Sequence, residues 1–177
     1  MYQKGIKRLL DVVLSACGLL VLSPLLLLLC LAIKLDSPGP VFFKQKRVGI
    51  HKSYFNILKF RTMRIDTPHD MPTHLLHDPD QYITRMGHFL RKTSLDELPQ
   101  LLNILKGDLS IVGPRPERPE IAAQYCEEMP EFALRLQAKA GLTGYAQVYG
   151  KYNTTPYDKL QMDLMYICLL YTSPSPR

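Results

Sequence analysis

The sequence contains no closely spaced pair of cysteines and no internal repeat. Its four cysteines are Cys17, Cys30, Cys126 and Cys168. They form no C-x-x-C motif and match no zinc-ligand spacing, which argues against a structural zinc module. Two of them fall in an apolar stretch, where they can pack as small hydrophobic residues. The pattern also argues against a disulfide scaffold, and nothing in it requires an oxidising compartment.

Charged residues are a modest fraction of the sequence, and the basic ones outnumber the acidic ones. Of the 177 residues, 46% are hydrophobic and 21% charged, which is typical of one folded domain and not of a disordered or fibrous chain. Lysine and arginine number 22 against 16 acidic residues, a net charge of +6. This excess favours an anionic partner: nucleic acid, a phosphorylated ligand or an acidic membrane surface. Because no nucleic-acid reader motif is recognisable, we expect no nucleic-acid partner.

A long uncharged run dominates the N-terminal part of the chain. Residues 12–33 carry no charged side chain and are mostly leucine, valine, isoleucine and alanine. As one helix this run would extend about 33 Å, the thickness of a bilayer core. A soluble core helix would show a polar stripe, which the run lacks. A cleaved signal peptide does not fit, because the most apolar part, residues 25–31, has no small-residue cleavage site. We predict a membrane helix that stays on the protein.

The middle and the ends of this run indicate how it sits in the membrane. Ser23 and Pro24 lie near its midpoint, and proline removes a backbone hydrogen bond, so a bend is expected there. Basic residues flank both ends, and the positive-inside rule would place both in the cytoplasm. We predict a re-entrant helix–break–helix over residues 1–36 that enters and leaves by the same face. A kinked spanning helix is the alternative.

The remaining sequence predicts an α+β, helix-dominated fold, with a small cytoplasmic domain at residues 37–167 that contains a β-hairpin and amphipathic helices. The hairpin is predicted from β-prone runs at 41–43 and 54–58. The other predicted elements are an irregular loop at 66–82, helices at 82–90, 94–106 and 117–140 with a break at Pro130, a strand or turn at 109–112, and a turn at 141–144.

Two adjacent carboxylates, Asp96 and Glu97, are the sharpest candidates for chemistry. Ser94 with Glu97 three residues later forms a capping box, and alternatively Asp96 is itself the N-cap. Either register places both carboxylates at the positive end of a helix, where the macrodipole keeps an aspartate ionised. Such an aspartate can bind a divalent cation or act as a nucleophile. The alternative is that both carboxylates only cap the helix.

Basic residues lie on both sides of this pair in the sequence. Arg91 and Lys92 precede it, and Arg115 and Arg118 follow it in the proline-rich stretch 114–119. Arginine binds phosphate oxygens in bidentate fashion, and a stiff backbone lowers the entropy cost of presenting it. A rigid connector with solvated arginines is the alternative. Basic residues beside paired carboxylates are what a metal-assisted phosphoryl transfer would use.

Taken together, the motifs resemble the bacterial sugar transferases of the monotopic phosphoglycosyl transferase family. The resemblance covers residues 4–167 in collinear order, and its ordered set of motifs is specific although each motif alone is weak. The matching segments are residues 7–11 (KRLLD), 23–24 (SP), 37–42 (SPGPVF), 45–49 (QKRVG), 59–63 (KFRTM), 90–101 (LRKTSLDELPQL), 107–116 (GDLSIVGPRP) and 141–148 (GLTGYAQV).

The resemblance implies a Mg²⁺-dependent enzyme that transfers a sugar-1-phosphate from a UDP-sugar to undecaprenyl phosphate and releases UMP. This step initiates the assembly of a polysaccharide, such as an exopolysaccharide, or of a glycoconjugate. Asp96 matches the family nucleophile, which forms a covalent aspartyl-phosphosugar intermediate and holds Mg²⁺ at least in part. Glu97 would assist the metal site or proton transfer. A non-catalytic membrane-anchored scaffold of the same fold is the alternative.

The resemblance also assigns roles to further positions. Arg91 and Arg115 match phosphate-binding arginines, with Lys59 and Arg61 near the site. The structural positions are Pro114 and Pro116, which frame Arg115, and the Ser23–Pro24 break; Asp163 matches an acidic position without an assigned role. The implied location is the bacterial inner membrane, monotopic, with the catalytic domain on the cytoplasmic face against membrane lipid; a homodimer is possible. Residues 168–177 depart from the family pattern, and we expect a non-native or disordered tail there.

Overall fold

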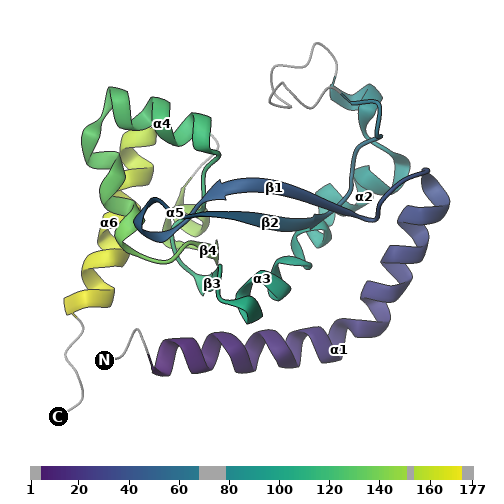
Figure 1. Cartoon of the computed structure of the whole chain (residues 1–177), viewed down its shortest axis with the longest axis horizontal. Coiled ribbons are helices and arrows are strands. Elements are labelled where there is room, and N and C mark those ends of the chain that lie inside the picture. Colours follow the sequence, from purple (N-terminus) through teal and green to yellow (C-terminus); the bar gives the residue numbers. More distant parts are fainter. Residues whose placement is uncertain (1–4, 68–78, 151–153, 173–177) are drawn as a thin grey trace.

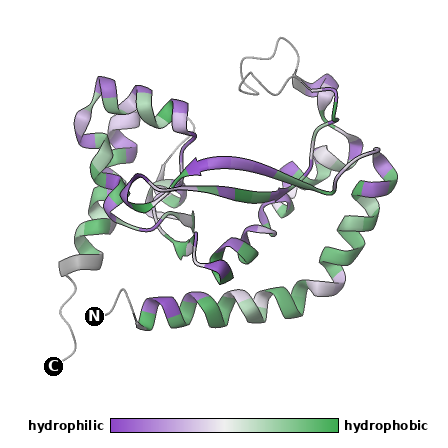
Figure 2. Ribbon diagram, in the orientation of Figure 1, coloured by the Kyte–Doolittle hydropathy of each residue, from purple (hydrophilic) through white to green (hydrophobic). Residues whose placement is uncertain are grey.

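The apolar run forms one long helix, α1 (Ile6–Asp36), which lies along one side of the molecule (Figure 1). The computed structural model describes residues 5–67, 79–150 and 154–172. Helix α1 is apolar over most of its length (Figure 2) and carries Pro24 in its interior. It bends midway, as expected from the lost hydrogen bond, but it stays helical through the bend. The predicted break is therefore a bend within a continuous helix. This is the one described helix long and apolar enough to cross a membrane.

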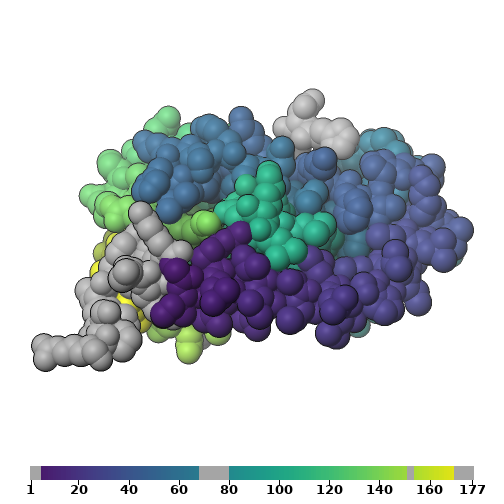
Figure 3. Space-filling model, turned by 60° about the horizontal axis from the view of Figure 1, so that its bottom comes forward, coloured from purple at the N-terminus to yellow at the C-terminus, as the bar shows by residue number. Residues whose placement is uncertain are grey.

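The first half of α1 is fastened to the domain by polar contacts. Arg8 donates to the backbone carbonyls of Ile104 and Leu105 at 2.5 and 2.7 Å. The buried carboxylate of Asp11 accepts from the Ser110 hydroxyl at 2.8 Å. Figure 3 shows this part of the helix in purple, directly against the teal segment around residues 100–106.

The last turn of α1 is fastened to the same domain. The Asp36 carboxylate accepts from the backbone N–H of Met86 at 3.0 Å. The turn that follows is held by Arg61, which donates to the carbonyls of Ser37 and Pro38 at 2.8 and 2.5 Å. Both ends of the long helix thus meet one domain.

The predicted hairpin is confirmed, and it is longer than expected. Strand β1 (Phe42–Val48) pairs antiparallel with β2 (Tyr54–Phe60) through the turn η1 (Ile50–Lys52). At one end of the hairpin Phe60 is buried with Leu29, Ile33 and Leu90, which joins β2, α1 and the helix α2 (Arg85–Thr93) in one apolar core.

The predicted helix at 94–106 is wrong in its first half. The described elements here are η3 (Pro79–Tyr82), α2 (Arg85–Thr93), η4 (Leu95–Glu97) and α3 (Gln100–Lys106). Helix α2 runs past residue 90, so Ser94 becomes its left-handed C-cap, with φ 57°. Ser94 therefore cannot form the predicted capping box, and the Asp96–Glu97 pair lies in a separate 3₁₀ turn ahead of α3. The loop expected at 66–82 falls mainly on residues 68–78, outside the described residues.

The C-terminal third differs from the prediction in three places. Strand β3 (Ser110–Val112) pairs in parallel with β4 (Gly141–Thr143), where a turn was predicted. Gly141 is needed for close approach, because a Cβ there would collide with the Gly113 backbone. The helical stretch breaks at Pro130 as predicted, into α4 (Pro119–Glu128) and η5 (Pro130–Gln137), but its second part is 3₁₀. After α5 (Tyr145–Tyr149), helix α6 (Pro156–Thr172) extends through residues 168–172, the first part of the segment expected to be a non-native or disordered tail.

Candidate active site

The two adjacent carboxylates of η4 meet basic side chains from distant parts of the chain. Lys59, near the end of β2, places its Nζ 2.6 Å from Glu97 Oε1 and 3.9 Å from Asp96 Oδ2. Arg115, from the loop after β3, reaches the same Glu97 oxygen with its Nη2 at 3.0 Å. The left-handed residue Ser94 ends α2, and the turn η4 that follows lies against β2. Four of the predicted site residues are therefore brought together.

The two carboxylates have opposite pKa shifts. Burial raises the pKa of Asp96, the negative charge of Glu97 adds to that effect, and Lys59 and Arg91 only partly oppose it. Burial acts in the same direction on Glu97, but Arg115 and Lys59 outweigh it and lower the pKa of that carboxyl. Glu97 is consequently a firmly ionised partner of two cations. Asp96 keeps a more basic carboxylate, which is the better nucleophile of the two.

Asp96 borders a cavity of about 420 Å³, which is within the usual size range of small-molecule sites. Its wall contains both basic and apolar residues. The basic lining residues are Arg47, Lys59, Arg61, Arg64, Arg91 and Arg118, and the apolar ones are Pro40, Phe42, Phe43, Phe60, Met63 and Ile65. Cations in this excess over carboxylates suit an anionic ligand such as a diphosphate.

The other predicted residues divide between the cavity and the scaffold. Arg91 borders the cavity and is oriented by a hydrogen bond from its Nε to the Thr62 hydroxyl at 3.0 Å. Its pKa is lowered by burial. Arg61 also borders the cavity, but its guanidinium group holds the turn after α1. Ser23 and Pro24 lie within α1. In the described part of the chain, neither residue lines the cavity or takes part in an ion pair.

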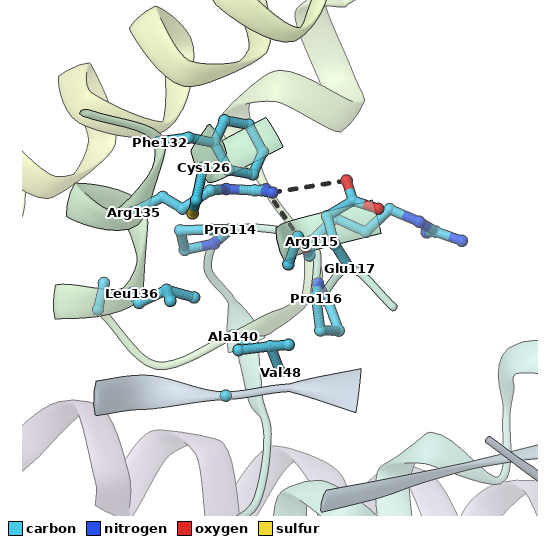
Figure 4. A pocket seen from close by; sticks show the side chains of 13 residues that line it. Val48, Pro114, Arg115, Pro116, Glu117, Cys126, Phe132, Arg135, Leu136 and Ala140 are labelled. Carbon is cyan, nitrogen blue, oxygen red and sulfur yellow. Dashed lines mark hydrogen bonds and ion pairs between the residues drawn. The ribbon is translucent and has the colours of Figure 1, made fainter. Parts of the chain in front are cut away.

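A buried arginine, Arg135, contacts the loop that carries Arg115 (Figure 4). Arg135 donates to the Arg115 carbonyl at 2.9 Å and forms a 2.7 Å ion pair with Asp163 of α6. Asp163 is fully buried, and burial raises the pKa of its carboxyl although Arg135 opposes the shift. Glu117 lies 3.5 Å from the other Nη of Arg135. The acidic position without an assigned role is thus part of the support of Arg115.

Pro114 and Pro116 flank Arg115, and proline rings restrict the backbone at both positions. A third anchor comes from Arg47 of β1, which donates to the Pro116 carbonyl at 3.0 Å. The cavity beside these prolines measures about 20 Å³, room for a single water, and cannot hold a substrate.

Sequence reasoning missed Arg47 and Arg135 as parts of the site. Phe43, Gln45 and Arg47 occupy every second position of β1, so their side chains share one face of the hairpin. Strand periodicity could therefore have linked Arg47 to this face. Arg135 and Asp163 are each set among apolar residues in the sequence. Charged residues are seldom buried without a partner of opposite charge. That rule is the only signal in the sequence that could have predicted the pairing of Arg135 with Asp163.

The donor set fits a magnesium ion only if a substrate completes its coordination. No cluster of three or more His, Cys, Asp or Glu side chains occurs within residues 5–67, 79–150 and 154–172. Mg²⁺ is commonly held by one or two carboxylates together with substrate phosphates and water. Asp96 borders the cavity while Glu97 is engaged by Lys59 and Arg115, so Asp96 is the residue that would hold the ion beside a bound diphosphate.

Comparison with known proteins gives consistent results. The family model for "Bacterial sugar transferase" matches residues 2–171. A UDP-glucose:undecaprenyl-phosphate glucose-1-phosphate transferase of Caulobacter vibrioides is 51% identical over 146 residues, 81% of this chain and 54% of that protein. A UDP-N-acetylgalactosamine-undecaprenyl-phosphate N-acetylgalactosaminephosphotransferase of Aeromonas hydrophila is 39% identical over 92% of this chain and 39% of that protein.

An exopolysaccharide production protein, PSS, of Rhizobium leguminosarum bv. phaseoli is 45% identical over 82% of this chain and 74% of its own length. Against the first three curated relatives, the chain spans between 28% and 54% of their length. The matched region includes the Asp96–Glu97 pair, the proline-flanked Arg115 and helix α1. The chain belongs to the bacterial sugar transferase family.

Proposed function

We propose that this protein transfers a sugar-1-phosphate from a UDP-sugar to undecaprenyl phosphate, releasing UMP, and so initiates the assembly of a polysaccharide or glycoconjugate. The observation that carries the proposal is the placement of Asp96. It has a raised pKa and borders a substrate-sized cavity whose wall is rich in lysine and arginine. The names of the relatives support the two substrate classes, and they include both glucose and N-acetylgalactosamine donors.

In the proposed reaction the Asp96 carboxylate attacks the sugar-bearing phosphorus of the UDP-sugar. A new phosphorus–oxygen bond forms to Asp96, and the bond to the bridging oxygen breaks, so that UMP leaves with the electron pair. A phosphate oxygen of undecaprenyl phosphate then attacks the same phosphorus and expels the Asp96 carboxylate. The product is the lipid diphosphate sugar, and the enzyme is regenerated.

The surrounding cations make this attack by one anion on another feasible. Lys59 lies beside Asp96 and reduces the charge repulsion, and Arg91, which borders the cavity, offers donors to phosphate oxygens. Arg115 does not line the cavity, and it adds positive charge next to the pair through its contact with Glu97. Glu97 orients Lys59 and Arg115, since both cations share its Oε1. Mg²⁺ held by Asp96 and the diphosphate would neutralise charge on the departing UMP.

We infer further that α1 is re-entrant and that the domain sits on the cytoplasmic face of the inner membrane. Arg8 near one end of α1 and Asp36 at the other both bond to the same domain. A helix that spanned the bilayer would place one of its ends across the membrane from the domain, so contacts at both ends support the re-entrant arrangement. A lipid acceptor and a water-soluble nucleotide sugar meet only at the membrane surface, and basic residues favour an anionic lipid surface.

The topology is tested by labelling single cysteines at Gln3→Cys and Lys46→Cys in a variant whose four native cysteines are replaced. Membrane-impermeant maleimide should label both from the cytoplasmic side. Labelling from opposite sides would exclude the re-entrant arrangement.

The reaction is tested by UMP release from a panel of UDP-sugars with undecaprenyl phosphate and Mg²⁺. We expect release by the wild type and by Glu131→Gln, a matched change at an exposed carboxylate, but not by Asp96→Asn. Without acceptor, mass spectrometry of the Asp96 peptide should show a phosphosugar adduct. Equal UMP release by Asp96→Asn would rule out Asp96 as the nucleophile. No UMP release by any variant with any donor would favour a non-catalytic scaffold.

A further inference from the structure

A neutral side chain, and not a carboxylate, holds the cavity residue Arg91. Its Nε donates to the Thr62 hydroxyl at 3.0 Å, and among the residues that the structure describes Arg91 forms no ion pair. A guanidinium group is planar, so a hydrogen bond at Nε restricts the orientation of the whole group. The bond at Nε leaves both Nη groups available to other partners. A hydroxyl therefore orients a cation that borders the cavity.

Thr62 is itself held firmly. It is buried, and its carbonyl accepts from the backbone N–H of Thr84 at 3.1 Å. Thr84 is the N-cap of α2, and its side chain accepts from the N–H of Gly87 at 2.9 Å. A Cβ at position 87 would collide with the Thr62 carbonyl oxygen, so only glycine allows this approach. The start of α2 is thus packed directly against the Thr62 backbone, beside the end of the hairpin (Figure 1).

One face of α2 meets Thr62 twice. Arg91 follows Gly87 by four residues, so the two positions lie on the same face of the helix, one turn apart. Gly87 contacts the Thr62 carbonyl, and Arg91 contacts the Thr62 hydroxyl. Thr62, Arg91 and Asp96 all border the same cavity. A rigid acceptor at this point lowers the entropy cost of holding a long arginine side chain in one rotamer.

We propose that Thr62 is a positioning residue for the phosphoryl transfer, and that its hydroxyl holds the Arg91 guanidinium group in the orientation that binds phosphate oxygens beside Asp96. This role rests on the proposed function, because the phosphate ligand is taken from it. Thr62 acts through Arg91 and needs no contact with the reacting atoms. Donors that are oriented in advance stabilise the charge of a transition state without reorganising during the reaction.

The first test removes only the hydroxyl. Thr62→Val keeps the branched shape of the side chain without the acceptor, and we expect kcat/KM of the transfer to fall about tenfold. Thr62→Ala, which also lacks the hydroxyl but fills less space, should show the same loss. Thr62→Ser keeps the acceptor and should restore most of the activity. The matched control is Thr93→Val, because the exposed Thr93 hydroxyl donates only within α2, to the Phe89 and Leu90 carbonyls, and its loss should leave the transfer unchanged.

The second test asks whether Thr62 acts through Arg91. Arg91→Met alone should lower kcat/KM about a hundredfold, the usual effect of losing one preorganised donor. Thr62→Val combined with Arg91→Met should then be no slower than Arg91→Met alone, because the oriented group is already absent. A purely structural role of Thr62 would instead lower the rate by the same factor in both backgrounds, and that result would overturn the proposal.

The third test needs no catalysis. Nuclear magnetic resonance of ¹⁵N-labelled protein in detergent detects arginine Nε–H signals, and the signal that is lost in Arg91→Met identifies Arg91. Its exchange with water should be about tenfold faster in Thr62→Val than in the wild type, and unchanged in Thr62→Ser and Thr93→Val. The Kd for inorganic pyrophosphate, followed on the same signals, should rise about tenfold in Thr62→Val only.

The tests distinguish failure of the positioning role from failure of the proposed function. Faster exchange and weaker pyrophosphate binding in Thr62→Val, without sugar-phosphate transfer by any protein, would support the role of Thr62 toward an anion and refute the proposed reaction. Normal transfer by Thr62→Val and Thr62→Ala would support the reaction and overturn the role of Thr62. An equal loss of transfer in Thr62→Ser would also overturn it, because the hydroxyl would then not be the group that matters.

Discussion

The neighbouring carboxylates Asp96 and Glu97 are expected to affect stability in opposite directions when neutralised. Glu97→Gln removes the charge that Lys59 and Arg115 share. The Lys59–Glu97 contact is 2.6 Å long between side chains only 17% and 22% exposed, so it contributes about 1.5–3 kcal/mol. Arg115 is 46% exposed, and solvent screening limits its contribution to about 1 kcal/mol at most. The free energy of unfolding should therefore fall by about 2–4 kcal/mol.

Asp96→Asn should not lower stability at neutral pH. The pKa of Asp96 is raised in the folded protein by burial and by Glu97, so the folded state holds that proton more tightly than the unfolded chain. The ionised form is therefore unfavourable for folding above the folded pKa. A neutral amide removes this cost, and we expect stability equal to that of the wild type or higher.

The assay is thermal unfolding of both variants and of Glu131→Gln in one detergent, at pH 7.5 and at lower pH. At pH 7.5 we expect the Tm of Glu97→Gln to fall by about 5–10 °C and that of Asp96→Asn to stay or rise. The lowered pKa of Glu97 means that its contribution is present above the unfolded pKa and is lost as the pH falls through the folded one. The deficit of Glu97→Gln should therefore shrink in acid. An equal loss of Tm in both variants at pH 7.5 would refute the assignment of distinct roles to the two carboxylates.

Three further outcomes follow from the contacts described above. Asp163→Ala leaves the buried guanidinium of Arg135 without its 2.7 Å partner and should cost about 3–5 kcal/mol in urea unfolding, whereas a loss below about 1 kcal/mol would mean that the pair is replaceable. Asp11→Ala removes the acceptor that joins α1 to β3 and should lower the unfolding free energy by about 1–3 kcal/mol, measured by thermal unfolding in detergent; an unchanged Tm would place that contact outside the folded core. In the pH profile of kcat/KM, the acid limb should lie above the usual aspartate pKa, because the pKa of Asp96 is raised. Lys59→Met should move this limb to still higher pH, since Lys59 lowers the pKa of Asp96. A limb that stays in place would exclude Asp96 as the titrating group.

Local patterns in the sequence were sufficient for much of the fold. The uncharged run predicts α1, because helix length and apolar composition are properties of consecutive residues. The alternating β-prone runs predict the hairpin, and Pro130 predicts the break between α4 and η5. The Asp96–Glu97 pair stands out for the same reason, since two adjacent carboxylates near basic residues can be read directly from the chain.

Only the tertiary structure determined how the environments of Asp96 and Glu97 differ. Lys59 and Arg115 are 38 and 18 residues away from Glu97 in the sequence, and their positions determine which carboxylate is neutralised and which stays basic. The ends of α2 and α3 were likewise set by packing, which made Ser94 a left-handed cap instead of a helix start. Electrostatic shifts depend on distance and burial in three dimensions, and neither is a property of neighbouring residues. The sequence therefore determined which residues are available for chemistry, and the fold determined which carboxylate the cations engage and which one borders the cavity.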